Sequence, residues 1–226
     1  MKLKINIPDT LNDITLAQYV EFDKINIEGN QDTVFLMQKT VEIFCRVKLD
    51  LTLQIKYKDL VDITQHIYSL LDSQPELTTL FKIDDIEYGF IPKLDDITLG
   101  EYIDLDNYLG RWEEMDKAMS VLFRPVTYRK EERYLIEEYD GSKYASIMHH
   151  APLGVVIGAM LFFWNLKNEL LDHSLNFLQK EMGENLTTEQ LKTLEVDGVG
   201  ISQSLHSLQE ILKDLKISQN SMQSNV

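Results

Sequence analysis

A segment of eleven residues occurs twice in the chain, and it constrains the fold more than any other feature. Residues 13–23 read DITLAQYVEFD and residues 96–106 read DITLGEYIDLD, with six identical positions and five close substitutions. Ile-Pro precedes both copies, at residues 7–8 and 91–92. A segment that recurs together with its flank predicts the same local structure in both places, and therefore two related units within the chain.

Each copy carries the signature of a helix start. Thr15 with Gln18, and Thr98 with Glu101, fit the capping-box pattern, in which the hydroxyl and the longer side chain each satisfy a backbone N–H of the first turn. We therefore expect a helix to begin beside each threonine. One face of each predicted helix is apolar, with Leu16, Tyr19 and Val20 in the first copy and Leu99, Tyr102 and Ile103 in the second.

Alternation of apolar and polar residues, which is typical of a β-strand, precedes each of these helices. Residues 2–7 alternate before the first copy, and residues 86–91 alternate before the second. Residues 79–83 alternate as well, so they are predicted to pair with residues 86–91 as a short hairpin. Each unit is therefore predicted to run from a strand through Ile-Pro to a capped helix.

A second apolar helix is predicted in each unit. Residues 37–46 and 115–124 carry Met, Lys and Arg in register, although two amphipathic helices can also match by chance. Arg46 and Arg124 would lie at the C-terminal ends of these helices, where a cation interacts favourably with the helix dipole. Pro125 would end the second helix.

The rest of the chain is predicted to be mainly helical. Residues 57–71 show helical periodicity, residues 134–139 fit a strand or a helix, and Pro152 begins a long helix that runs to about Met182. The predicted fold class is α+β, mainly α, with a small β-sheet or hairpin and two tandem strand–capped helix–helix repeats. The predicted units are residues 1–85, residues 86–182 with the long apolar helix, C-terminal helices at 183–217 and a disordered tail at 218–226.

The start of the long helix is the most apolar part of the sequence. Residues 153–164 carry no charge, yet they are too few for the about 20 residues that span a bilayer, so a buried core helix is predicted. A protein interface remains the alternative for these residues. Gly154 and Gly158 lie four apart, which permits close approach of another segment. In lipid such a pair would mark a dimerisation face, whereas in water it indicates tight internal packing.

The net charge of -15, with a pI near 4.7, restricts the kinds of molecule that the chain is expected to bind. Nucleic acids and anionic membranes are bound through Lys and Arg, so we expect neither as a partner. A basic protein partner, or simple solubility, fits this charge. Cys45 is the single cysteine and cannot form an internal disulfide, and residues 1–8 lack the apolar core of a signal peptide.

The sequence patterns that carry catalysis are missing, so we expect no enzyme, no cofactor and no catalytic residue. No glycine-rich phosphate loop, H-E-x-x-H or G-x-S-x-G is present. Glu169 and His173 are four apart but lack further ligands at metal-site spacing, so no metal is expected. Asp104 and Asp106 resemble part of a calcium loop whose glycine comes one place late, and they fit a solvated helix face better. Cys45 lies among apolar residues, which predicts an inert core thiol.

The arrangement of Ile-Pro, Asp-Ile-Thr-Leu and a helix resembles small acidic virion and tail-assembly proteins of tailed bacteriophages of Bacteroidetes, including the crAss-like group. Residues 119–125 and 152–164 add to this resemblance, which covers residues 1–172. It implies an assembly or structural role through protein–protein contacts, in particular as a tail assembly chaperone, in the host cytoplasm or the virion. A stoichiometric virion component (connector, ring or internal protein) and a small regulator of a host enzyme are the alternatives. No functional residues are carried over.

The outer half of the long helix is the partner-binding surface that the sequence predicts. Its apolar stripe is interrupted by charged residues, as is typical of a helix half covered by another protein. We expect the partner to be another phage structural protein or a second copy of the chain. The predicted contact residues are Leu170, Leu171, Leu175, Phe177 and Leu178.

Overall fold

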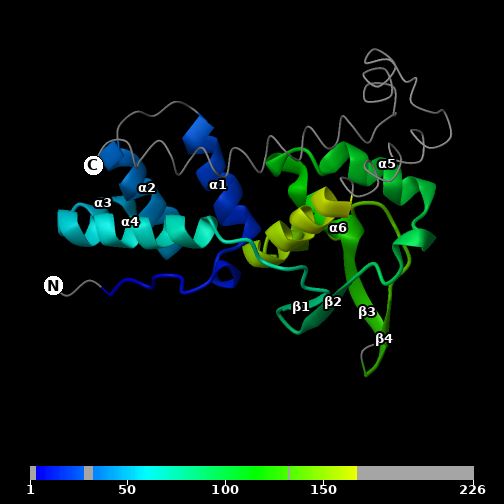
Figure 1. The fold of residues 1–226 in the computed structure, drawn as a ribbon. Helices are drawn as coiled ribbons and strands as arrows, with labels where there is room; N and C mark the ends of the chain where they lie inside the picture. The colour runs from blue at the N-terminus through cyan, green and yellow to red at the C-terminus, as the bar shows by residue number, and fades with distance from the viewer. Residues whose placement is uncertain (1–3, 28–32, 132, 167–226) are drawn as a thin grey trace, which may run out of the picture.

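A computed structural model describes residues 4–27, 33–131 and 133–166 and shows two lobes (Figure 1). Most of these residues are helical and one small sheet completes the fold, so the α+β, mainly α, class is confirmed. The first lobe contains η1 (Leu11–Asp13), α1 (Leu16–Ile27), α2 (Thr33–Cys45), α3 (Leu49–Thr52) and α4 (Tyr57–Leu71). The second lobe contains β1 (Leu80–Ile83), β2 (Ile86–Phe90), η2 (Leu94–Asp96), α5 (Leu99–Tyr108), η3 (Trp112–Glu114), α6 (Met115–Leu122), β3 (Phe123–Lys130), β4 (Arg133–Ile136) and α7 (Ala145–Met148).

The sheet is antiparallel, with its strands in the order β1-β2-β3-β4. β1 and β2 form the predicted hairpin. Residues 134–139 fitted a strand or a helix, and residues 134–136 belong to the strand β4. Gly89 is required on β2, because a Cβ atom there would lie 2.6 Å from the ring of Tyr134. The Tyr134 hydroxyl donates a hydrogen bond of 2.9 Å to the carbonyl of Phe90, which fixes β4 against β2.

The prediction of a strand at residues 2–7 is wrong for residues 4–7, which the structure describes. Residues 4–8 have no regular secondary structure, and a strand forms only where a neighbouring strand takes up its backbone hydrogen bonds. The segment lies beside α4 instead, where His66 Nε2 donates a hydrogen bond of 2.9 Å to the Pro8 carbonyl (Figure 1). The repeat of a whole strand–helix–helix unit is therefore not confirmed.

Both capping boxes are present. The Thr15 N–H donates to Gln18 Oε1 at 3.0 Å and the Gln18 N–H donates to Thr15 Oγ1 at 3.3 Å. The corresponding distances between Thr98 and Glu101 are 2.7 and 3.2 Å. α1 and α5 consequently begin one residue after their threonines, as the sequence predicts.

The longer side chain of each capping box also holds the end of the next helix. Gln18 Nε2 donates a hydrogen bond of 2.6 Å to the carbonyl of Ile43 near the end of α2. Glu101 Oε1 accepts a hydrogen bond of 2.5 Å from Arg124 Nη1, just beyond α6. The chemistry of the partner explains the Gln/Glu difference between the copies, because a carbonyl requires a donor and a guanidinium requires an acceptor.

The prediction that Arg124 lies at a helix C-terminus is wrong. α6 ends at Leu122, and Arg124 is the second residue of β3, with its side chain buried against Glu101. Pro125 does not end the helix, because α6 has already ended at Leu122. It lies in β3 and pairs with Tyr88 of β2. The guanidinium is stabilised by a carboxylate and by the ring of Tyr139, 5.9 Å away, and not by a helix dipole.

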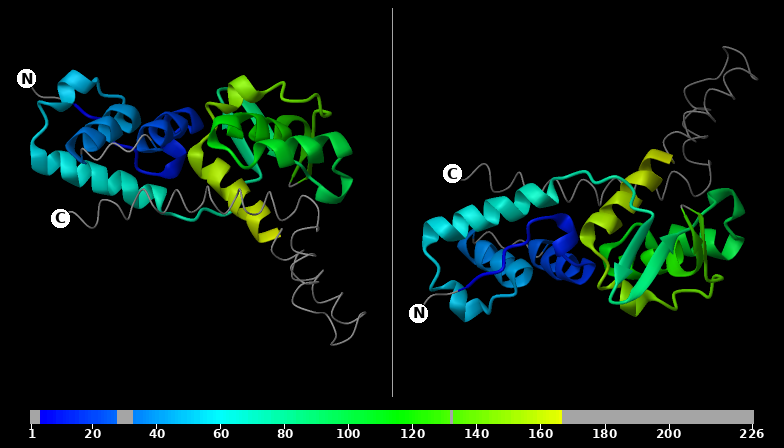
Figure 2. Two further views of the ribbon diagram at one scale, coloured as in Figure 1. Left: turned by 90° about the horizontal axis from the view of Figure 1, so that it is seen from above. Right: turned by 90° about the horizontal axis from the view of Figure 1, so that it is seen from below.

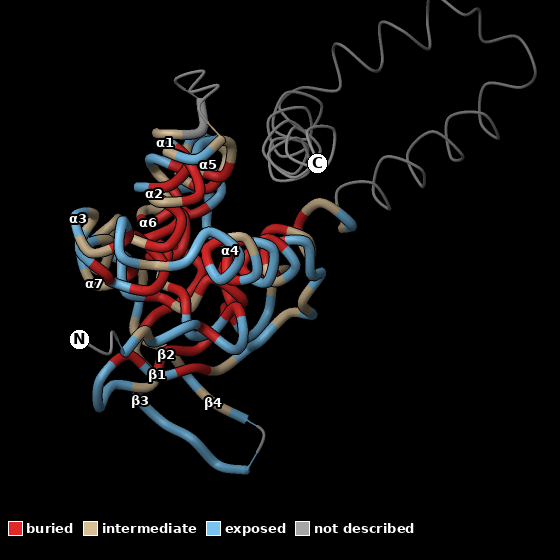
Figure 3. The backbone as a smooth tube through the Cα atoms, turned by 90° about the vertical axis from the view of Figure 1, so that its left-hand side faces the viewer, coloured by how far each residue is buried: buried red, intermediate tan, exposed pale blue. Residues whose placement is uncertain are grey.

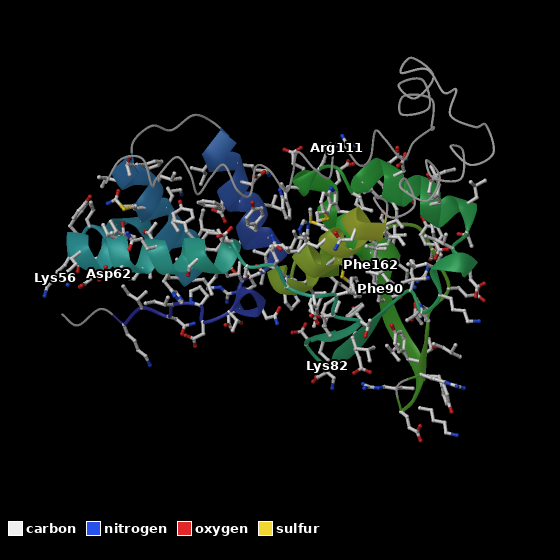
Figure 4. All side chains as sticks on the ribbon, viewed as in Figure 1. Lys56, Asp62, Lys82, Phe90, Arg111 and Phe162 are labelled. Carbon is white, nitrogen blue, oxygen red and sulfur yellow. The ribbon has the colours of Figure 1, made fainter. Side chains whose placement is uncertain are left out.

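A further helix covers residues 153–166 and lies at the junction of the two lobes (Figure 2). Its aromatic side chains belong to the core, since Phe162 and Phe163 lie 5.7 and 6.0 Å from the ring of Phe90 on β2 (Figure 4). Among the described residues, no helix is long and apolar enough to cross a membrane. The apolar run at residues 153–164 is therefore mainly internal packing, with several residues fully buried.

The two glycines of this helix face the first lobe, in agreement with the internal-packing interpretation. A Cβ atom on Gly154 would lie 2.4 Å from Asn12 Oδ1, beside η1. A Cβ atom on Gly158 would lie 2.5 Å from the backbone carbonyl oxygen of Glu76, in the segment between α4 and β1. The absence of side chains at both positions allows the lobes to meet closely.

Replacing Gly158 with alanine should therefore destabilise the protein by about 1–3 kcal/mol through overpacking. The atom that the new methyl group meets belongs to the backbone of Glu76, so no side-chain rotation relieves the contact. Gly100→Ala is the matched control, because its nearest neighbour is Tyr139 at 3.4 Å and alanine is favoured over glycine in a helix by about 1 kcal/mol. Urea unfolding measures both variants, and an unchanged Gly158→Ala midpoint would contradict the close contact.

Candidate protein-binding site

The two copies of the repeated segment differ most in the exposure of one helix face. In α1, Leu16 is fully buried and Tyr19 is 2% exposed. At the same positions of α5, Leu99 is 74% exposed and Tyr102 is 44% exposed, and Ile103 next to them is 48% exposed. The sequence predicts an apolar face in both copies, but only the first copy buries it.

The first copy is buried because it binds the second lobe. The backbone N–H groups of Leu16 and Ala17 donate to the carbonyls of Ala151 and His149, both at 2.9 Å, and the Leu153 N–H donates to Ile14 at 2.8 Å. The ring of Tyr19 lies 4.3 Å from the ring of Trp112, which is itself buried. The start of α1 therefore forms a contact between the two lobes of the same chain.

The second copy is attached to its own lobe in the same way as the first. Glu101 and Leu105 are 3% and 4% exposed, as Gln18 and Phe22 are buried in the first lobe. One side of α5 therefore packs on the core of its own lobe, and the opposite side of the helix faces outward. We call this side the α5 face, and it consists of Leu99, Tyr102, Ile103 and Asp106, which follow one another at helical spacing.

The helix α5 lies at the top of the second lobe, away from the sheet (Figures 1 and 3). Its C-terminal end is acidic, because Asp104 and Asp106 lie there without a salt bridge among the described residues, whereas Glu101 is buried against Arg124 and Asp96 pairs with Lys93 at 3.7 Å. Asp104 accepts a hydrogen bond from the Tyr139 hydroxyl, and burial together with this neighbouring carboxylate raises the pKa of Tyr139. Asp106 is half-buried at the end of the apolar stripe.

A groove of about 720 Å³ lies between the start of α5 and β4. Glu101 and Arg124 line it and neutralise each other in a buried ion pair, and Arg133 and Leu135 of β4 line it as well. Burial alone would raise the pKa of Glu101, but hydrogen bonds from Thr98 and Arg124 outweigh it and lower that pKa. No cluster of three potential metal ligands is present among residues 4–27, 33–131 and 133–166.

A second unusual surface lies on the β3–β4 hairpin, which extends from the bottom of the second lobe (Figures 1 and 3). Tyr128 pairs with Leu135, and Lys130 pairs with Arg133, so these four side chains share one face of the two strands. Tyr128 and Leu135 are 56% and 60% exposed. We call this surface the hairpin face.

The two cations of the hairpin face have no ion-pair partner among the described residues. Arg129, on the opposite face, is different because it binds Glu87 of β2 at 2.6 Å. The chain thus presents a basic and apolar surface on its hairpin although its net charge is -15.

The predicted contact residues Leu170, Leu171, Leu175, Phe177 and Leu178 lie outside the part of the chain that the structure describes, as do Glu169 and His173. Cys45 agrees with its interpretation as an inert thiol, since it is buried and burial raises its pKa to about 11. Sequence reasoning missed both exposed faces. The α5 face resembled a core face, and of the hairpin face only Leu135 lay in a segment with a prediction, residues 134–139, which fitted a strand or a helix.

Comparison of the chain with models of known protein families, with curated proteins and with solved structures gives no match. Function must therefore be inferred from the two exposed faces and from the sequence.

Proposed function

We propose that this chain is a non-enzymatic assembly protein of a tailed bacteriophage that works by binding other proteins, in particular as a tail assembly chaperone. One observation carries the proposal. The α5 face exposes large apolar side chains at the positions that make an internal protein contact in the first copy. Exposed apolar patches on soluble proteins commonly mark sites of protein interaction.

The chemistry of the α5 face indicates how a partner would be bound. Leu99, Tyr102 and Ile103 have the i, i+3, i+4 spacing by which a helix inserts anchors into an apolar groove. The carboxylates around them would favour a partner with basic residues at the rim of that groove. An acidic chain with such a face can cover an aggregation-prone surface of a partner until assembly, which is the action expected of a chaperone.

A stoichiometric virion component is the second candidate. It is favoured by the presence of two exposed faces on different elements of the second lobe, because a subunit of a ring or connector contacts neighbours on two sides.

A photo-crosslinking experiment tests whether the α5 face binds another chain. Ile103 is replaced by a photo-reactive phenylalanine analogue, and Asp62, which is exposed on α4 of the other lobe, provides the control position (Figure 4). We expect irradiation of phage-producing cells to join position 103, but not position 62, to another structural protein of the phage or to a second copy of the chain. Equal or absent crosslinks at the two positions would contradict the proposed function.

The amount of the chain in purified particles distinguishes the two candidates. A tail assembly chaperone should crosslink during assembly and be absent from finished particles, because its partner surface is then covered by other subunits. A virion component should be present in a fixed copy number per particle, measured by quantitative mass spectrometry.

A further inference from the structure

The α5 face and the hairpin face complement each other in both polarity and charge. The hairpin face offers the exposed apolar pair Tyr128 and Leu135 flanked by Lys130 and Arg133. The α5 face offers an exposed apolar stripe that ends at Asp106, with the carboxylate of Asp104 nearby on the same helix. An apolar centre with opposite charges at its rim is the composition expected of two surfaces that bind each other.

A single chain cannot bring these two faces together. The helix α5 lies at the top of the second lobe and the β3–β4 hairpin extends from the bottom of the same lobe (Figures 1 and 3). The lobe between them is a packed core that includes Tyr88, Phe123 and Met119, all fully buried. The partner of each face must therefore come from a different chain.

The overall charge argues that any contact between copies must use a local basic surface. Chains that each carry a net charge of -15 repel one another. The hairpin face presents two neighbouring exposed cations, Lys130 and Arg133, without an ion-pair partner in the described part of the chain. It is therefore suited to meet the acidic surface of a second copy.

We propose that copies of this chain associate head to tail, with the hairpin face of one copy bound to the α5 face of the next. This proposal rests on the proposed function, since it names a second copy as the partner of the α5 face. The contact is heterologous, because it joins two different faces. An open assembly therefore keeps one free α5 face at one end and one free hairpin face at the other end. Repetition of such a contact yields a closed ring if the rotation closes and a filament if it does not.

The test uses two variants that each disable one face of the full chain. Ile103→Asp places a charge in the α5 face, and Leu135→Asp does so in the hairpin face. Leu53→Asp is the matched control, because Leu53 is 75% exposed and belongs to neither face. Light scattering after size-exclusion chromatography measures the mass in solution at about 1 μM to about 1 mM, the range of weak dissociation constants.

We expect the wild type and Leu53→Asp to exceed the monomer mass of 26.3 kDa as the concentration rises. Each face variant alone should remain a monomer at concentrations at least about tenfold higher, since about 1.4 kcal/mol lost from a contact weakens it tenfold. An equimolar mixture of the two face variants should form a dimer and nothing larger, because one intact face of each kind remains. Association of the wild type should also weaken with salt, which screens the charged rim.

Three results would overturn the proposal: a wild type that stays monomeric throughout, face variants that associate like the wild type, or a mixture of the two that stays monomeric. A contact between like faces would instead leave one of the two variants associating like the wild type. If circular dichroism shows that an aspartate variant has not folded, Asp106→Lys and Lys130→Glu replace the pair and the same mixture is measured. A monomeric wild type together with a position-103 crosslink to another particle protein would refute self-association and leave the proposed function standing.

Discussion

Replacing Tyr19 with alanine is expected to destabilise the protein by about 3–5 kcal/mol, as removal of a large buried aromatic side chain does. The same replacement at Tyr102 should change the free energy of unfolding by less than about 0.5 kcal/mol, as is usual at exposed positions. The two tyrosines occupy equivalent places in the repeated segment. Tyr19 is 2% exposed and contacts Trp112, whereas Tyr102 is 44% exposed on the α5 face.

Urea unfolding of the two variants, followed by circular dichroism at a concentration where the protein is monomeric, measures this difference. Each variant is the other's control, because both lose the same atoms from the same sequence context. Equal losses of stability would mean that the α5 face is covered within its own chain, and the case for a docking surface would fail.

The second large effect is expected at the buried ion pair. Glu101→Gln should destabilise the protein by about 3–5 kcal/mol, because it leaves the charge of Arg124 buried without a counter-charge. The side chains of Arg124 and Glu101 are 8% and 5% exposed, so water only partly replaces the lost carboxylate. Replacing both residues with apolar ones of similar size, as in Glu101→Leu with Arg124→Met, should recover much of this loss. A Glu101→Gln variant as stable as the wild type would show that the pair contributes little.

The same pair gives the protein a defined dependence on pH. The pKa of Glu101 is lowered in the folded chain from its ordinary value of 4.5, so its contribution to stability is complete above that value. The contribution is lost as the pH falls below 4.5 and through the folded pKa, where the carboxylate takes up a proton. The stability difference between the wild type and Glu101→Gln should therefore shrink in acid. A constant difference would assign the effect to packing and not to charge.

Much of the fold was accessible from the sequence because its signals are local. The capping boxes at Thr15 and Thr98 determine where α1 and α5 begin, and the alternation on both sides of Asp84 and Asp85 determines the β1–β2 hairpin. Each signal depends on hydrogen bonds or side-chain directions between near neighbours. The strand predicted at residues 2–7 failed because a strand also needs a partner, which a pattern within one segment cannot supply.

The candidate site depended on information that no local pattern contains. Leu16 and Leu99 lie in nearly identical segments, yet one is fully buried and the other is 74% exposed. The difference arises from residues 149–153 and Trp112, which contact the first copy. Arg124 likewise appeared to be a helix-terminal cation until the turn into β3 placed it beside Glu101. Which of two similar faces is covered is a property of the tertiary structure.

Hydroxyl-radical footprinting of tyrosines tests most directly whether the α5 face binds another chain. Oxidation of Tyr102 is compared between dilute purified protein and the protein in cells that assemble particles, with Tyr57, which is 65% exposed on α4, as the internal reference. We predict that Tyr102 is oxidised in the dilute protein and protected during assembly, while Tyr57 is oxidised equally in both. Equal oxidation of Tyr102 in the two states would contradict the role of the α5 face.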